Sequence, residues 1–221
     1  MYTIKGCLFD MDGVIVDTAK HHFTAWKALA EELSIPFTSK DNEALKGLGR
    51  LDSLEKILQL GNLELNSNTK LKLMENKNSL YLELVRSMSE EDILPGVCGL
   101  IEELKVKGIG VCLGSSSRNA SIILKNIGLF NLFDGVVDGN HLTFSKPDPE
   151  VFIKGAKILE LSPSNCVVFE DAVAGVEAAK SGGFFALGVG DHKELDNADA
   201  VVSDLSKMNF SKLLEIVNRN D

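Results

Sequence analysis

The sequence predicts an α/β protein with a doubly wound parallel sheet and an inserted α-helical cap. Apolar runs at residues 4–10, 109–114, 166–170 and 184–189 alternate with helical patterns. Alternation of this kind is typical of a parallel sheet with helices on both faces. Residues 17–90 contain no strand pattern, which indicates a separate helical insertion after the first strand.

The elements follow from hydrophobic periodicity. Short apolar runs predict the four strands just named, and Ala200-Val201-Val202 predicts an edge strand. Helices of the sheet region are expected at 97–107, 120–127, 149–159 and 175–181. Amphipathic patterns predict cap helices at 22–33, 52–60 and 69–88. We therefore expect a discontinuous core of residues 1–16 and 91–221, with the cap spanning 17–90.

Composition excludes several classes of protein. A formal net charge of −9 argues against nucleic acid as a partner. No apolar stretch is long enough for a membrane span, and no signal peptide pattern is visible. The four cysteines form no C-x-x-C pair, which is typical of reduced thiols rather than disulfides or zinc ligands. We expect a cytoplasmic monomer without a membrane or nucleic-acid partner.

Two carboxylates follow the first apolar run. Asp10 and Asp12 have the i, i+2 spacing that points side chains of an extended chain the same way, and Gly13 allows a tight turn after them. In open α/β sheets, ligands bind at the carboxyl ends of the strands. One carboxylate could then attack phosphorus while the other transfers protons. A surface Asp-X-Asp-Gly turn is the alternative.

Three further segments carry polar groups at predicted strand or turn ends. Gly114-Ser115-Ser116-Ser117-Arg118-Asn119 follows the run 109–113 and favours an anion site, although one serine could simply cap a helix. Lys146 precedes Pro147 and could provide a point charge for phosphate. The alternative is an inert lysine on the surface. Glu170 and Asp171 end a strand and would repel each other without a cation such as Mg²⁺ between them.

The ordered set of acid pair, hydroxyl loop, lysine and second acid pair resembles the four motifs of the haloacid-dehalogenase-like phosphotransferases, over essentially the whole chain. The resemblance implies that Asp10 is the phosphoryl-accepting nucleophile and Asp12 the general acid/base. It further implies that Ser115 and Lys146 hold the transferring phosphoryl group. Mg²⁺ would be the cofactor, and its implied ligands are Asp10, the backbone carbonyl of Asp12, Glu170 and Asp171.

Two cap segments, 17–27 and 45–50, resemble those of the phosphosugar mutases in this family. The resemblance implies that Arg50 holds a distal phosphate, that Lys46 and Gly47 contact the sugar, and that His22 helps to place Asp12. The same distal site would be completed from the core by Ser117, Arg118 and Asn119, and Ser116 would be a further substrate-binding residue. The alternatives are a solvated helix face carrying Lys46 and Arg50, and a passive surface position for His22.

The resemblance to these mutases implies a Mg²⁺-dependent enzyme that interconverts β-glucose 1-phosphate and glucose 6-phosphate. The reaction would use an aspartyl-phosphate enzyme and a β-glucose 1,6-bisphosphate intermediate. A sugar-phosphate phosphatase with the same motifs is the alternative, and a receiver that is only phosphorylated on aspartate is a third interpretation. Gly49, Ser116 and Ala172 depart from the mutase pattern, but they remove no charge and no catalytic carboxylate.

Overall fold

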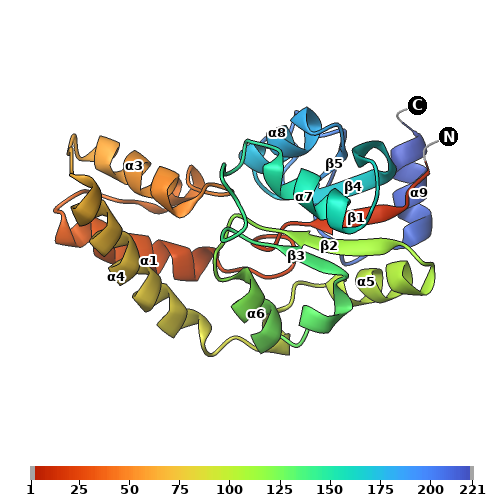
Figure 1. Cartoon of the computed structure of the whole chain (residues 1–221), viewed down its shortest axis with the longest axis horizontal. Helices are drawn as coiled ribbons and strands as arrows, with labels where there is room; N and C mark the ends of the chain where they lie inside the picture. Colours follow the sequence, from red (N-terminus) through yellow and green to blue (C-terminus); the bar gives the residue numbers. More distant parts are fainter. Residues whose placement is uncertain (1–2, 220–221) are drawn as a thin grey trace.

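A computed structural model describes residues 3–219, and its centre is a six-stranded parallel sheet (Figure 1). The strand order is β3-β2-β1-β4-β5-β6, and every neighbouring pair is parallel. The strands are β1 Gly6–Phe9, β2 Gly110–Gly114, β3 Gly135–Val137, β4 Cys166–Glu170, β5 Phe185–Val189 and β6 Ala200–Val202. The predicted parallel sheet is confirmed, and β6 lies at its edge as expected.

Helices cover both faces of the sheet, so the doubly wound arrangement is also confirmed. Cys7 and Phe9 of β1 belong to one apolar cluster with α5, α6 and α9, whereas Leu8 belongs to a second cluster with α7 and α8. Successive residues of a strand point to opposite faces, which explains this division. The helices are α5 Val97–Val106, α6 Ala120–Asn126, α7 Glu150–Ile158, α8 Val173–Ser181 and α9 Phe210–Asn218.

Four helices lie together beyond one end of the sheet, on the left of Figure 1. They are α1 Ala19–Glu32, α2 Ser39–Glu43, α3 Arg50–Leu60 and α4 Ser67–Val85. A third apolar cluster, which includes Trp26, Leu54 and Leu73, holds α1, α3 and α4 together. The cap is therefore helical, as the sequence predicts. The division of the chain at residues 16/17 and 90/91 stays a prediction.

Three elements, β3, α2 and α9, were not expected from the sequence. Strand β3 has only three residues, too few for an apolar run to be recognised. Helix α9 has a visible signal, because Asn209 accepts a hydrogen bond from the backbone N–H of Lys212 and apolar residues follow at helical spacing. Three short 3-10 turns complete the described elements, at Glu90–Asp92, Phe130–Leu132 and Pro163–Asn165. In the described part of the chain, no helix is long and apolar enough to cross a membrane.

Candidate active site

The centre of the site is Lys146, which joins two strand ends. Asp10 directly follows β1 and Glu170 ends β4, and these strands are neighbours paired through Phe9 and Phe169. The Nζ atom of Lys146 lies 2.5 Å from Oδ1 of Asp10 and 2.5 Å from Oε1 of Glu170. Lys146 is 1% exposed and Asp10 is 5% exposed. The surface alternatives for the Asp-X-Asp-Gly turn and for the lysine are therefore wrong.

The charge on Lys146 is held by its two partners. Burial alone would lower the pKa of this ammonium group, but the negative charges of Asp10 and Glu170 and their hydrogen bonds raise its pKa above the ordinary value. The cation therefore stays charged at neutral pH beside the Asp10 carboxylate. A fixed positive charge at this position can offset the repulsion between an anionic nucleophile and a phosphoryl group.

Three carboxylates form a group that can hold a metal ion. One oxygen each from Asp10, Glu170 and Asp171 lies within 4.8 Å of the others. Burial raises the pKa of Glu170 to about 7, with a further contribution from Asp10. Burial, Glu170 and Asp10 raise the pKa of Asp171 well above its usual range. Such a group is stabilised when a hard cation balances its charge, so the donor set fits a divalent ion with oxygen ligands.

The backbone after β4 makes room for the Glu170 carboxylate. The N–H of Ala172 donates to Oε2 of Glu170 at 2.8 Å. A Cβ atom on Gly175 would overlap the same carboxylate, so a residue without a side chain is required in this turn of α8. This close approach explains the glycine that follows the second acid pair in the sequence.

Asp12 lies two residues beyond Asp10 and is only partly exposed. The hydroxyl of Thr18 donates a hydrogen bond to its Oδ1 atom. Burial and the charge of Asp10 raise the pKa of Asp12 to about 7, although the Thr18 hydroxyl, Lys146 and Lys77 act in the opposite direction. A carboxyl with such a pKa can both give and accept a proton near neutral pH, as a general acid/base must.

The hydroxyl loop after β2 is folded around its first serine. Ser115 is 1% exposed, and its Oγ accepts a hydrogen bond from the N–H of Ser117 at 3.1 Å. Ser117 Oγ in turn accepts from the N–H of Asn119 at 3.2 Å. The N-cap of α6 is Asn119, so none of the three serines caps that helix and this alternative is wrong.

The cap and the core meet across this loop. Ser116 Oγ donates to the carbonyl oxygen of Gly47 at 2.9 Å. Arg50 Nη2 donates to Asn78 Oδ1 at 2.7 Å, and Asn119 Nδ2 donates to the same oxygen at 2.8 Å. Burial and the nearby Arg118 lower the pKa of Arg50. Two guanidinium groups and an amide therefore gather where an anion would be favoured.

Lys46 does not continue into the helix of Arg50. It lies in a turn before α3, and its Nζ atom is 2.7 Å from Glu43 and 3.8 Å from Asp171. The alternative of one solvated helix face for Lys46 and Arg50 is therefore wrong. Lys46 instead joins the cap to the carboxylate group of the core.

His22 lies against α4 rather than on a bare surface. Its Nδ1 atom is 3.1 Å from Nζ of Lys77, and its ring centroid is 4.3 Å from that of Tyr81. Burial and the charge of Arg50 lower the pKa of Lys77 to about 7. The same ammonium group lies 4.4 Å from the centroid of the Trp26 ring. Lys77 thus connects His22 to the apolar interior of the cap.

Three residues near the site were not assigned from the sequence. Thr18 bonds Asp12, Asn78 bonds both Arg50 and Asn119, and the buried hydroxyl of Tyr81 has no hydrogen-bond partner among the described residues. No local motif marks Asn78 or Tyr81, because their neighbours in the fold are distant in the chain. Thr18 lies only six positions after Asp12 in the sequence. Its role is therefore the one of the three that the sequence could have suggested.

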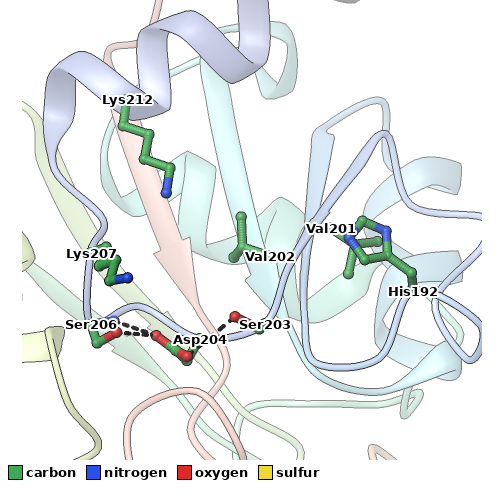
Figure 2. Close-up of a pocket in the computed structure, with 8 residues that line it drawn as sticks. All are labelled: His192, Val201, Val202, Ser203, Asp204, Ser206, Lys207 and Lys212. Atoms are coloured by element: carbon green, nitrogen blue, oxygen red, sulfur yellow. Dashed lines mark hydrogen bonds between the residues drawn. The ribbon is translucent and has the colours of Figure 1, made fainter.

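Two cavities were found in the described part of the chain, one beside the candidate site and one away from it. One of about 490 Å³ is lined by Gly13 and Asp171 of the core and by Glu43 and Lys46 of the cap. Asp171 is the member of the three-carboxylate group that lines this cavity. A second, of about 350 Å³, lies at β6 and the start of α9, and Figure 2 shows its lining side chains. None of the residues predicted for the site lines this second cavity.

The fold and the four polar segments define a class of protein. Residues 4–183 match the haloacid dehalogenase-like hydrolase family, and the chain belongs to this family. The family predicted from the motifs is thereby confirmed.

Individual members of the family are similar to this chain over nearly its whole length. The chain is 44% identical over 214 residues to the beta-phosphoglucomutase of Bacillus subtilis (strain 168), covering 96% of this chain and 95% of the relative. It is 32% identical over 208 residues to the phosphorylated carbohydrates phosphatase of Thermotoga maritima, covering 90% and 93%. The crystal structure of beta-phosphoglucomutase from Clostridium difficile superimposes with a TM-score of 0.95 at 37% identity, covering 98% of both chains.

Proposed function

We propose that this chain is a phosphosugar mutase that interconverts β-glucose 1-phosphate and glucose 6-phosphate through β-glucose 1,6-bisphosphate. The observation that carries the proposal is that cationic side chains lie at two places in the site, each of which could hold a phosphate. Lys146 lies beside Asp10, and Arg50 lies beside Asn119 on the cap side of the site. Beta-phosphoglucomutases of similar sequence and fold support it. A cytoplasmic monomer that binds a free phosphosugar stays our expectation.

Asp10 is the nucleophile of the proposed reaction. Its carboxylate oxygen attacks phosphorus, and the bond between phosphorus and the sugar oxygen breaks, which leaves a phosphoryl group on Asp10. Lys146 and Ser115 hold the oxygens of that group. Asp10, Glu170, Asp171 and the backbone carbonyl of Asp12 would hold Mg²⁺, which supplies positive charge that balances the phosphoryl oxygens.

Asp12 transfers the proton in this scheme. The leaving sugar oxygen takes a proton from the Asp12 carboxyl, and in the second half-reaction Asp12 accepts the proton of the attacking sugar hydroxyl. The pKa of about 7 supports both roles, because neither protonation state is costly to reach at neutral pH. Thr18 fixes the carboxyl through its hydrogen bond, and His22 helps to place it from the cap.

The cap distinguishes a mutase from a phosphatase. A bisphosphate must bind in two opposite orientations, so the phosphate that is not reacting needs its own site. Arg50 offers a bidentate fork for that phosphate, and Ser117, Arg118 and Asn119 complete the site from the core. Lys46 and the backbone of Gly47 contact the sugar between the two phosphates. Asp10 is nearly buried, which limits the access of water.

The phosphatase remains the second candidate, because a phosphatase that acts on phosphorylated carbohydrates is also a relative over nearly the whole chain. In that reaction water, rather than a sugar hydroxyl, attacks the aspartyl phosphate. A receiver that is only phosphorylated would need neither the cap nor the anion site at Arg50.

The direct test supplies β-glucose 1-phosphate, Mg²⁺ and a trace of β-glucose 1,6-bisphosphate, and follows glucose 6-phosphate and free phosphate together. A mutase forms glucose 6-phosphate with little free phosphate. A phosphatase releases phosphate as the main product. A receiver shows neither product in repeated turnovers.

A further inference from the structure

One amide oxygen joins the cap to the core beside the expected phosphate site. Oδ1 of Asn78, in the middle of α4, accepts hydrogen bonds from Nη2 of Arg50 at 2.7 Å and from Nδ2 of Asn119 at 2.8 Å. The three residues come from α4, the start of α3 and the loop before α6. Two good hydrogen bonds on a single oxygen determine the positions of both donors.

The chemistry of an amide suits this position. Burial and the nearby Arg118 already lower the pKa of Arg50, so two cationic side chains lie near each other at this site. A carboxylate at position 78 would neutralise that charge, whereas an amide oxygen orients the guanidinium and leaves its charge available to an anion. Within residues 3–219, the hydrogen bond to Asn78 uses only Nη2 of Arg50, and the guanidinium has further N–H groups that can form a bidentate pair with phosphate oxygens.

We propose that Asn78 is a positioning residue that aligns Arg50 and Asn119 for the non-reacting phosphate when the cap meets the core. The inference rests on the proposed function, since a phosphosugar mutase must hold that second phosphate. Asn78 itself takes no part in bond formation at Asp10. Its effect passes through the two donors that it holds.

Two substitutions separate this role from a merely structural one. Asn78→Ala removes the acceptor, and Asn78→Asp keeps the shape but adds a negative charge that pairs with Arg50 and repels phosphate. Asn76→Ala is the matched control, because Asn76 is an exposed residue of the same helix. Unfolding temperatures measured for all three variants verify that the fold survives.

The measured quantities are kcat and KM for β-glucose 1-phosphate, and the rate of phosphoryl transfer from acetyl phosphate, which carries no second phosphate. Asn78→Ala should raise KM about tenfold, the effect of losing one hydrogen bond to a charged group. Asn78→Asp should raise it further, despite its similar shape. Both variants should keep the acetyl phosphate rate within about twofold of the wild type, because this donor does not use Arg50.

Equal losses of activity with β-glucose 1-phosphate and with acetyl phosphate would overturn the positioning role. A smaller rise in KM for Asn78→Asp than for Asn78→Ala would overturn it as well. An unchanged KM in Asn78→Ala, with a wild-type enzyme that forms glucose 6-phosphate, would remove the role of Asn78 alone. A wild-type enzyme that does not act on β-glucose 1-phosphate would remove the proposed function and this role with it.

Discussion

Gly13 leaves the space that the carboxylate of Asp171 occupies. A Cβ atom on Gly13 would overlap Oδ2 of Asp171, and the backbone of Gly13 has a φ of +79°, which other residues rarely adopt. The turn after the first acid pair and the second acid pair are therefore packed directly against each other, although 158 positions separate Gly13 from Asp171 in the sequence (171 minus 13).

Gly13→Ala should lower the free energy of unfolding by about 1–3 kcal/mol and weaken metal binding, because strain and the displaced Asp171 act together. Gly99→Ala is the control, since a Cβ atom on Gly99 of α5 meets nothing within 4 Å. Alanine there should leave stability equal or slightly higher. Urea unfolding and Mn²⁺ titration measure both effects. A Gly13→Ala variant with normal stability and metal affinity would contradict the contact.

Asp10→Asn tests the nucleophile. The amide keeps the size of the side chain but cannot attack phosphorus, and it removes one carboxylate from the candidate metal group. Turnover should fall by roughly four to six orders of magnitude, while circular dichroism shows the native fold. Turnover above about 1% of the wild-type rate would mean that another group accepts the phosphoryl.

Asp12→Asn tests the acid/base role with two phosphoryl donors. Transfer from β-glucose 1-phosphate should fall by about 10²–10⁴-fold, because the sugar oxygen must be protonated as it leaves. Transfer from acetyl phosphate needs no such proton and should fall much less. Rapid-quench measurement of phosphoenzyme formation compares the two rates. If both donors lost the same factor, Asp12 would not be the proton donor.

The raised pKa of Glu170 predicts that the stabilisation of the fold by Mg²⁺ depends on pH. The pKa of Glu170 is raised from 4.5 to about 7, so between these values the folded state binds more protons than the unfolded state. The metal-free protein should therefore lose stability as pH rises through this range. Mg²⁺ needs the ionised carboxylates, so its stabilising effect should grow over the same range, to about 2.7 kcal/mol at 100 times its Kd.

Thermal unfolding in Mg²⁺ and in EDTA, each at pH 5, 6, 7 and 8, measures that difference. The gap between the two unfolding temperatures should widen from pH 5 to pH 8. A constant gap would show that no carboxyl with a raised pKa takes part in metal binding.

Much of this fold was predictable from local patterns, because buried parallel strands are apolar and end in polar residues at one edge. Asp10 and Glu170 could be expected together for this reason, since each follows or ends such a strand. Strand β3 could not be predicted, because three residues are too few to form a recognisable apolar run. The contacts of Asn78 could not be foreseen, because Arg50 and Asn119 lie 28 and 41 positions away. Contacts of this kind depend on how the cap meets the core, which hydrophobic periodicity does not specify.

The partition of the phosphoenzyme between sugar and water tests the proposed mutase most directly. The measurement is the ratio of free phosphate to glucose 6-phosphate formed from β-glucose 1-phosphate, in the wild type and in Arg50→Ala. Losing the guanidinium should cost about 2–4 kcal/mol of binding to the distal phosphate. We expect a low ratio in the wild type, and in Arg50→Ala a sharply lower rate of glucose 6-phosphate formation with a higher ratio. A wild-type enzyme that mainly releases phosphate, with the ratio unchanged in Arg50→Ala, would contradict the mutase and favour the phosphatase.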